Sequence, residues 1–277
     1  MNTRTILVTG GTGKTGRRIV QRLAGSPHAV RVGSRSATPS FEWSNEGTWE
    51  AALKGVDAAY VCYYPDVAAR GAAETIASFV DAARRAGVSR LVLLSGRGEP
   101  EAQRCEEIVA RSGVDWTLLR ASWFAQNFSE NFLLEPLLAG EVVLPAGDVG
   151  EPFVDADDIA EIAVKALTED GHAGQLYEIT GPRLWSFAQA VAEIGRAAGR
   201  DIRYVQVPVA DYAAALREAS VPADIAELVT YLFSEVLDGR NASVADGVQR
   251  ALGRLPRDFT DYARAAAATG VWAPSAR

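Results

Sequence analysis

The sequence is poor in the residues that build disulfide frameworks and metal centres. Its 277 residues include two cysteines, Cys62 and Cys105, and two histidines, His28 and His172. Two cysteines are too few for a disulfide framework, and neither residue type shows the spacing of a metal-ligand set. Each histidine adjoins a proline or a glycine, so we expect both to lie in turns at the surface. The sequence therefore predicts no disulfide framework and no metal site.

The sequence also lacks long hydrophobic runs and an excess of basic residues. No apolar stretch approaches the roughly 20 residues that a membrane-spanning helix needs. The N-terminus leads straight into an apolar, β-branched run instead of a signal peptide. The formal net charge of −7 argues against a broad nucleic-acid-binding surface. These absences predict a globular, cytoplasmic protein that binds neither membranes nor nucleic acid.

The first two dozen residues, by contrast, carry a clear pattern. Thr5–Thr9 is an apolar and β-branched run, a Gly-x-x-Gly-x-x-Gly turn follows at once, and Arg17–Leu23 has the apolar spacing of a helix. A strand, a glycine turn and a helix open a dinucleotide-binding βαβ unit. We expect Gly10 to permit the tight turn, Gly13 to let the backbone approach a pyrophosphate, and Gly16 to let the helix lie close to the strand. The expected cofactor contacts in this turn are Gly10, Gly11, Thr12, Gly13, Lys14, Thr15 and Gly16.

Two details refine the expected ligand. Gly13-Lys14-Thr15 resembles the end of a nucleoside-triphosphate P-loop, but that motif requires a glycine at the position of Val8, so the P-loop interpretation fails. Basic residues gather near the turn and predict a local anion site. They are Lys14, Arg17, Arg18, Arg31 and Arg35.

The end of the second expected strand indicates which dinucleotide binds. Sites that prefer NAD place a carboxylate there to hold the ribose 2′-hydroxyl. Here Ser34 and Arg35 follow the strand, and the next acid is Glu42. Arg35 can stack on adenine or pair with a 2′-phosphate, and Ser34 can add a hydrogen bond. The pattern predicts NADP(H); the alternative is a surface arginine in a loop.

Segments of strand and helix character alternate through the first half of the chain. The strand-like runs are 5–9, 29–32, 41–43, 58–62, 90–94 and 115–119. After the first helix, further helical patterns fall at about 48–53, 67–86 and 101–111. Apolar strands alternating with helices are typical of an α/β protein with a Rossmann-type, doubly wound parallel sheet.

The second half is less regular and predicts a smaller lobe. Short strands are expected at 142–144, 175–179 and 202–207, and a helix at about 157–167. Ser186 and Gln189 form a capping box that opens another helix. We expect an NAD(P)-binding Rossmann domain over residues 1–180 and a mostly helical substrate-binding lobe over 181–277, with a soft boundary and some interleaving.

Candidate active-site residues lie at the carboxyl ends of the expected strands, where ligands bind in doubly wound sheets. Rings at these positions favour the lining of a pocket. The candidate catalytic groups are the hydroxyls of Tyr63, Tyr64 and Ser95, and Ser95 is also a candidate cofactor contact. The candidate substrate-binding residues are Tyr63, Tyr64, Trp123, Phe124 and Asn127.

Neighbouring side chains also allow structural interpretations. Phe128 and Phe132 are expected to fill the core instead of lining a pocket. Asn127 could orient substrate or cofactor, or merely cap local backbone. Glu99 and Glu101 flank a proline at an expected helix start, where the helix dipole favours acids. The alternative for these two is a carboxylate that faces a cationic substrate.

Several motifs along the chain form one set. They are the glycine turn of 9–16, the strand end Leu118–Arg120, Phe124-x-x-Asn127 and the Pro-Phe-Val-Asp-x-Asp-Asp-Ile-Ala run of 152–160, continued at 166–169 and 177–182. Together they resemble the NmrA-like branch of the atypical short-chain dehydrogenase/reductase family over nearly the whole chain. Within it the chain is similar to triphenylmethane reductases, type 2 quinone oxidoreductases and ergot alkaloid cyclisation reductases. The resemblance implies a Rossmann domain with a small substrate lobe, and usually NADPH.

The proton donor of typical short-chain dehydrogenases is missing. Those enzymes use a Tyr-x-x-x-Lys pair, in which the lysine lowers the pKa of the tyrosine so that it can pass a proton. The chain has three lysines, Lys14, Lys54 and Lys165, and none follows a tyrosine by four residues. The stretch 95–114, where the pair belongs, contains neither residue type. Carbonyl reduction by this acid is therefore excluded.

These observations support two hypotheses from different classes. The first is an NADPH-dependent reductase that acts on a planar aromatic or electron-poor small molecule, such as an iminium compound, a dye cation or a quinone. The second, which the resemblance also permits, is a non-catalytic NADP(H) sensor that regulates a partner protein. A third alternative, an epimerase or dehydratase, is poorly supported because the tyrosine is absent. The sequence leaves a homodimer open.

Overall fold

The computed structural model describes residues 3–273, and the chain forms two compact units in it. The first unit contains residues up to 121, 156–179 and 246–254, and the second contains 122–155, 180–245 and the residues from 255 on. Residues 122–155, which the sequence analysis assigns to the first domain, therefore belong to the second unit by their contacts. Residues 246–254 return to the first.

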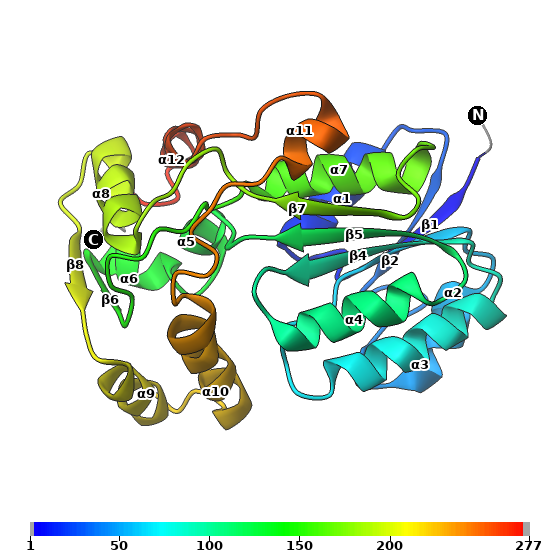
Figure 1. Ribbon diagram of the computed structural model, residues 1–277, viewed down its shortest axis with the longest axis horizontal. Helices are drawn as coiled ribbons and strands as arrows, with labels where there is room; N and C mark the ends of the chain where they lie inside the picture. Colours follow the sequence, from blue (N-terminus) through cyan, green and yellow to red (C-terminus); the bar gives the residue numbers. More distant parts are fainter. Residues whose placement is uncertain (1–2, 274–277) are drawn as a thin grey trace. The chain divides into compact units, whose positions relative to one another are not determined.

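The first unit is built on a six-stranded sheet of order β2-β1-β3-β4-β5-β7 (Figure 1). All neighbouring strands run parallel. The strands are β1 (Thr5–Thr9), β2 (Ala29–Gly33), β3 (Ala58–Val61), β4 (Arg90–Gly96), β5 (Asp115–Ala121) and β7 (Gln175–Ile179). The Rossmann-like α/β fold expected from the alternating pattern is confirmed.

One expected strand, 41–43, is not part of this sheet. Glu42 makes only an isolated antiparallel bridge to Asn45. Phe41 is instead buried, with its ring 5.8 Å from that of Phe79 and perpendicular to it. The run has the composition of a strand, but its aromatic rings pack with Phe79 of α3 instead of joining the sheet. The sixth parallel strand is β7, which lies beside β5.

Helices cover both faces of the sheet. α1 packs against α7 on one face, and α3 packs against α4 on the other (Figure 1). Leu7, Leu93 and Leu118 point into the core on the α3–α4 face. The helices of this unit are α1 (Lys14–Leu23), α2 (Trp49–Leu53), α3 (Ala72–Arg85), α4 (Pro100–Ala110), α7 (Ala156–Thr168) and α11 (Gly247–Leu252).

The helix α3 begins later than the sequence pattern indicates. The side chain of Asp66 accepts a hydrogen bond from the backbone N–H of Ala68 at 2.9 Å, which forms a turn. Gly71 then adopts a left-handed φ of 84° directly before the helix. Both features keep residues 66–71 out of α3, so the loop after β3 is longer than expected.

The second unit has an aromatic core beside a two-stranded parallel sheet. Phe128, Phe153, Phe187, Phe259 and Trp272 are fully buried in it. The sheet consists of β6 (Glu141–Leu144) and β8 (Arg203–Gln206). The helices are α5 (Asn127–Glu130), α6 (Leu134–Ala139), α8 (Phe187–Ala198), α9 (Val209–Glu218), α10 (Ala223–Tyr231), the π-helical turn Leu232–Val236 and α12 (Phe259–Ala268).

Two local expectations for this unit have opposite outcomes. The capping box is confirmed, since Ser186 and Gln189 exchange side-chain and backbone hydrogen bonds at the start of α8. Phe128 fills the core as expected, but Phe132 is 39% exposed, so the expectation for Phe132 is wrong. The chain leaves α5 after Glu130 in an extended conformation at Asn131, and this turns Phe132 outward. Within residues 3–273, every helix is too short or too polar to cross a membrane.

Candidate functional site

The glycine turn between β1 and α1 has the close packing that its sequence predicts. Gly10 adopts a left-handed φ of 61°, a conformation that favours glycine. A Cβ added to Gly16 would overlap the carbonyl oxygen of Gly10. The first turn of α1 therefore lies directly on the backbone of the loop, and neither glycine can be replaced without moving the chain.

The start of α1 is suited to an anion. Gly13 is its N-cap residue and provides no side-chain cap, and the first turn carries no acidic residue. The backbone N–H of Gly13 donates to the carbonyl of Gly10 at 2.8 Å, which fixes the conformation of the turn. A Cβ on Gly13 would meet protein only at that carbonyl oxygen, 3.2 Å away, so the outer side of Gly13 is open to a ligand. Backbone amides and the helix dipole favour a phosphate here.

Two hydroxyl groups fix the turn from within. The Thr15 hydroxyl is buried and accepts a hydrogen bond from the Tyr60 hydroxyl at 2.9 Å. The Thr9 hydroxyl donates to the Tyr60 carbonyl at 3.0 Å and accepts from the Cys62 N–H at 2.9 Å. These bonds join the glycine turn to the end of β3. Any contact of Thr15 with a cofactor is thus left to its backbone amide.

The end of β2 lies against the same turn. The Gly11 N–H donates to the Gly33 carbonyl at 3.2 Å, so Ser34 and Arg35 follow directly beside the loop. Arg35 is exposed and Ser34 is partly exposed, and the Ser34 hydroxyl lies 3.4 Å from that of Ser36. No acidic residue stands between Gly33 and Glu42. This strand end offers hydroxyl and guanidinium groups to a ligand.

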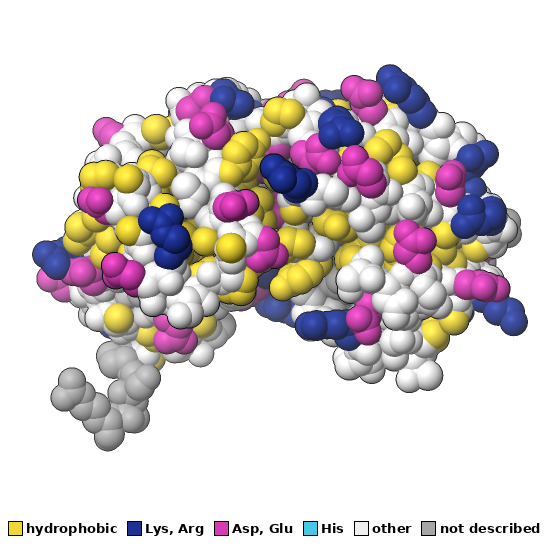
Figure 2. Space-filling view, turned by 90° about the horizontal axis from the view of Figure 1, so that it is seen from below, with side chains coloured by type: hydrophobic (Ala, Val, Ile, Leu, Met, Phe, Trp, Pro, Cys, Tyr) yellow, Lys and Arg dark blue, Asp and Glu magenta, His cyan; other side chains and the backbone are white. Residues whose placement is uncertain are grey.

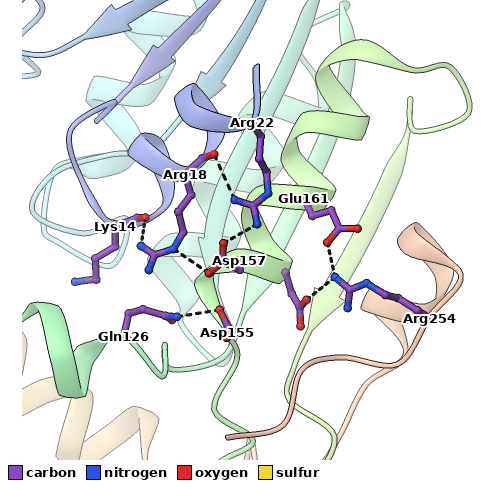
Figure 3. A network of polar contacts seen from close by, with 9 residues as sticks. Lys14, Arg18, Arg22, Gln126, Asp155, Asp157, Glu161 and Arg254 are labelled. Carbon is purple, nitrogen blue, oxygen red and sulfur yellow. Dashed lines mark hydrogen bonds and ion pairs between the residues drawn. The ribbon is translucent and has the colours of Figure 1, made fainter. Parts of the chain in front are cut away.

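The expected cluster of five basic residues is smaller in the structure. Arg31 donates to the carbonyls of Ala52 and Lys54 at 2.7 and 2.8 Å, so it stabilises the end of α2. Arg18 forms an ion pair with Asp157 of α7 at 3.3 Å, and Arg22 shares that carboxylate (Figure 3). The expectation is therefore wrong for Arg18 and Arg31, whose guanidinium groups hold the fold. The remaining basic residues of the set are Lys14, Arg17 and Arg35.

The shared carboxylate of Asp157 has a shifted pKa. Burial alone would raise it, but hydrogen bonds and charge from Arg22 and Arg18 hold the pKa of Asp157 below its usual value. Asp158 and Glu161 of α7 both pair with Arg254, and Figure 3 shows the contact between Glu161 and Arg254. Two ion-pair groups thus connect α7 with α1 and with the segment after α11.

The two tyrosines after β3 differ in environment. The Tyr63 ring is partly buried and lies 5.1 Å from the Trp43 ring, and the Trp43 indole donates to the Cys62 carbonyl at 2.9 Å. Tyr64 is 72% exposed. The Tyr63 ring is therefore held by its contact with Trp43, whereas the Tyr64 side chain is exposed in the loop after β3.

The end of β4 buries two polar groups. Ser95 is 4% exposed, and its hydroxyl oxygen has no hydrogen-bond partner among the described residues. Glu99 is 7% exposed, and a Cβ added to Gly96 would lie 2.6 Å from either carboxyl oxygen. Burial raises the pKa of Glu99 well above its usual value, and the charges of Asp66 and Glu106 raise it further.

The structure corrects the interpretation of Glu99. An acid at a helix start was expected to complement the helix dipole, but the Glu99 side chain makes no capping hydrogen bond to α4. Glu101 is partly exposed, pairs with Arg104 at 2.8 Å and accepts a hydrogen bond from the backbone N–H of Ala73 at 3.3 Å. Sequence reasoning thus missed Glu99 as a buried acid at the strand end. Its only local signal is the Gly-x-Gly-Glu run after Ser95, which lets a side chain fold back onto the strand.

The aromatic residues after β5 belong to the second unit. The Trp123 ring packs 5.3 Å from Phe187 and 5.0 Å from Phe233 of the π-helical turn. The backbone N–H of Trp123 donates to the Glu151 carboxylate at 3.2 Å, and Phe124 forms a parallel β-bridge with Val154. Trp123, Phe124 and Asn127 are each partly exposed. The segment 122–127 is thus anchored to 151–155, with Ser122, Ala125 and Gln126 buried.

The two histidines make hydrogen bonds within the first unit. The surface expectation is wrong for His172, which is 8% exposed and hydrogen bonds through Nδ1 to the Tyr177 hydroxyl at 2.9 Å. Burial lowers the pKa of His172. His28 is partly exposed and accepts from the Arg4 N–H. Among residues 3–273 no cluster of side chains has the composition of a metal site.

The parallel sheet and the uncapped glycine turn define a dinucleotide-binding Rossmann protein. Residues 10–170 match the family described as NAD(P)H-binding, and the chain belongs to that family. The oxidoreductase YesF of Bacillus subtilis is 32% identical over 96% of this chain and 97% of its own. The NAD(P)H azoreductase of Xenophilus azovorans is 32% identical over 95% and 98%. The agroclavine dehydrogenase of Claviceps fusiformis is 31% identical over 93% and 96%.

Solved structures show the same fold. The NADPH complex of the quinone oxidoreductase QOR2 from Escherichia coli has a TM-score of 0.78, with 22% identity over 93% of this chain and 98% of that one. Triphenylmethane reductase from Citrobacter sp. has a TM-score of 0.77, with 21% identity over 95% and 99%. The transcriptional regulator NmrA has a TM-score of 0.70, with 18% identity over 95% of each chain. With the family match and the reductase relatives, the chain is an NAD(P)H-dependent oxidoreductase.

Proposed function

We propose that the protein is an NADPH-dependent reductase that transfers hydride to a planar aromatic or electron-poor small molecule, such as an iminium compound, a dye cation or a quinone. The observation that carries this proposal is the combination of a cofactor turn with a missing Tyr-x-x-x-Lys acid. Hydride addition to a neutral carbonyl creates an alkoxide, which requires an acid or an oxyanion site. Hydride addition to an iminium or a carbocation gives a neutral product directly.

The proposed cofactor contacts fit the geometry of the first unit. The backbone of Gly10–Gly16 presents the uncapped start of α1 to the pyrophosphate, and the open side of Gly13 leaves room for it. Ser34 and Arg35 receive the 2′-phosphate, because they follow β2 with no carboxylate beside them. Ser95 lies near the end of β4 and is the proposed contact for the nicotinamide end, and its buried hydroxyl has no hydrogen-bond partner among the described residues. When bound, NADPH supplies the hydride and the protein supplies orientation and electrostatics.

The substrate class rests on aromatic side chains and on the relatives. Tyr63, Tyr64, Trp123 and Phe124 offer ring faces that attract a flat cation by roughly 0.5–2 kcal/mol each. Asn127 orients the bound molecule with its amide. An azoreductase and an agroclavine dehydrogenase are among the relatives, and the structures with the same fold include a quinone reductase and a triphenylmethane dye reductase.

The test is NADPH oxidation against a panel of acceptors. An iminium compound, a triarylmethane dye cation, a quinone and a simple ketone are each mixed with enzyme and NADPH, and absorbance at the cofactor band is followed. We expect turnover with the first three and none with the ketone. Gly13→Val serves as the matched control, because it blocks the cofactor turn without touching the proposed substrate residues.

The same experiment distinguishes the alternative function. A non-catalytic NADP(H) sensor would bind NADPH in a direct titration but would not oxidise it with any acceptor in the panel. Turnover of the ketone at the rate of the iminium compound would instead remove the proposed substrate class. A small-molecule substrate, a cytoplasmic location and a homodimer without nucleic-acid contacts complete this proposal, and gel filtration tests the homodimer.

A further inference from the structure

One buried tyrosine of β3 is bound to both ends of the glycine turn. The Thr9 hydroxyl, directly before the turn, donates to the backbone carbonyl of Tyr60 at 3.0 Å. The Thr15 hydroxyl, in the first turn of α1, accepts from the Tyr60 hydroxyl at 2.9 Å. Residues 10–14 therefore lie between two threonines that both contact Tyr60.

The hydroxyl pair is enclosed in the protein. Charged side chains of both signs lie on the face of the molecule that Figure 2 shows, whereas Tyr60 is fully buried and Thr15 is 3% exposed. Burial raises the pKa of Tyr60 well above its usual value, so the hydroxyl keeps its proton and remains a donor. Because the hydroxyl is closed to solvent, a substrate cannot contact it.

The strand register places Tyr60 beneath α1. Val8 of β1 and Tyr60 of β3 are neighbours in the parallel sheet. Side chains alternate along a strand, and Ala59 and Val61 pack in the cluster on the α3–α4 face. The Tyr60 side chain therefore points to the opposite face, which α1 and α7 cover (Figure 1). From there its hydroxyl reaches the first turn of α1.

Thr15 lies where α1 offers its backbone to an anion. The Arg17 N–H donates to the Gly13 carbonyl at 3.1 Å and begins the helical ladder of α1, so the Thr15 N–H lies before that ladder. Amides at such a position have no partner within the helix and favour an anion. Their position depends on where the first turn lies, and the bond between Tyr60 and Thr15 fixes that turn.

Packing alone does not require the two hydroxyls. Phenylalanine and valine would fill nearly the same space without a polar atom that needs a partner, and replacing both partners of a buried hydrogen bond in this way can be nearly neutral for stability. Threonine is also a weak helix former, so Thr15 adds little to α1 by its own propensity. The specific consequence of the pair is the attachment of the helix start to β3.

We propose that Tyr60 is a positioning residue of the cofactor site, which holds the glycine turn so that the backbone amides at the start of α1 meet the pyrophosphate of NADPH. This inference rests on the proposed cofactor contacts and is independent of the substrate. Tyr60 acts through Thr15 and contacts neither cofactor nor substrate. Loss of its hydroxyl should release the α1 end of the turn and keep the β1 end, whose bond uses the backbone carbonyl of Tyr60.

The first experiment separates cofactor binding from stability. Tyr60→Phe removes the donor, Thr15→Val removes the acceptor with little change of shape, and the double variant removes both. NADPH binding is measured by fluorescence titration, and stability by urea unfolding. We expect all three to bind NADPH about tenfold more weakly than the wild type, the scale of one hydrogen bond. Thr15→Val should be the least stable, because it leaves the Tyr60 hydroxyl buried without this partner, and the double variant should regain most of that stability.

Tyr262→Phe is the matched control. The Tyr262 hydroxyl is also buried and donates to a hydroxyl, that of Ser129, at 2.7 Å, but this pair lies in the second unit. The substitution removes the same atom from the same kind of bond. It should leave the affinity for NADPH within about twofold of the wild type.

The second experiment identifies the part of the cofactor that responds. Adenosine 2′-monophosphate carries the phosphate that we propose for Arg35 but has no pyrophosphate. Its affinity for Tyr60→Phe, measured by calorimetry, should stay within about twofold of the wild type while that of NADPH falls about tenfold. Equal losses for the two ligands would show that Tyr60 supports the site as a whole, and would overturn the proposal.

The remaining outcomes separate the inference from the proposed cofactor contacts. Wild-type NADPH affinity in Tyr60→Phe would overturn the role of Tyr60 and leave those contacts standing. Recovery of NADPH affinity together with stability in the double variant would show that the pair only supports the fold, which also overturns the proposal. Normal NADPH binding by Gly13→Val would instead remove the proposed contacts themselves, and this inference with them.

Discussion

The glycine turn allows its steric and its binding roles to be separated by two single substitutions. A Cβ on Gly16 would overlap the Gly10 carbonyl, a backbone atom that cannot swing aside. Overpacking of this kind costs about 1–3 kcal/mol, and a rigid backbone neighbour places Gly16→Ala at the upper end. At about 2–4 °C per kcal/mol for a chain of this size class, Tm should fall by about 6–12 °C.

Gly13→Ala should behave in the opposite way. Gly13 has φ of −79° and ψ of −177°, which any residue adopts, and its added Cβ would lie 3.2 Å from a single carbonyl oxygen. The loss of glycine at the N-cap should cost only about 0.5–1 kcal/mol of stability. The methyl group nevertheless projects into the space proposed for the pyrophosphate. Losing one or two charge-assisted hydrogen bonds at about 1.5–3 kcal/mol each should weaken NADPH binding about a hundredfold.

The assay compares thermal unfolding with a direct NADPH titration by fluorescence for both variants. We expect Gly16→Ala to be destabilised and weak in binding, and Gly13→Ala to be nearly as stable as the wild type yet weak in binding. Gly25→Ala is unsuitable as a control because Gly25 has a left-handed φ of 80°, whereas Gly47→Ala substitutes a glycine far from the turn in the sequence. Gly13→Ala with wild-type NADPH affinity would refute the placement of the pyrophosphate.

Three further predictions address selectivity, substrate binding and pH. Arg35→Ala should weaken NADPH binding by at least about tenfold and NADH binding little, measured by parallel titrations; equal losses would show that Arg35 does not meet the 2′-phosphate. Tyr63→Phe and Tyr64→Phe should keep most of kcat while Trp123→Ala mainly raises KM, and a kcat loss of about a hundredfold in either tyrosine variant would make that hydroxyl the acid. The pKa of Asp157 is lowered by its two arginine partners despite burial, so its carboxylate stabilises the fold at neutral pH and this contribution is lost as pH falls through the folded-state pKa. Asp157→Asn should therefore lower the unfolding free energy at neutral pH and flatten its decline in acid, as measured by urea unfolding; an unchanged acid limb would contradict this.

Local patterns predicted the parts of the fold that depend on neighbours in sequence. The strand Thr5–Thr9, the turn and the first helix follow from a β-branched run, three spaced glycines and an apolar helix face. The capping box at Ser186 is equally local, and the structure contains it. Such signals need no knowledge of the rest of the chain, because each is satisfied within a few residues.

The predictions failed where the local sequence allows two structures and contacts with residues distant in sequence decide between them. The run at 41–43 has strand composition, but the Phe41 ring packs against Phe79 of α3 in the core, and the run does not pair with the sheet. His172 adjoins a glycine and reads as a surface turn, yet its ring reaches Tyr177 of β7. The basic residues near the turn look alike in sequence, and only the structure shows that Arg31 caps carbonyls of α2 while Arg18 pairs with α7.

Glu99 shows why a motif of fixed spacing does not find every buried acid. A Tyr-x-x-x-Lys pair is a local signal, and the stretch 95–114 contains none. Burial raises the pKa of the Glu99 carboxyl group well above its usual value, and the charge of Asp66, from the loop after β3, raises it further. No spacing rule records that neighbour, because the distance along the chain between Asp66 and Glu99 is set by a whole helix and strand.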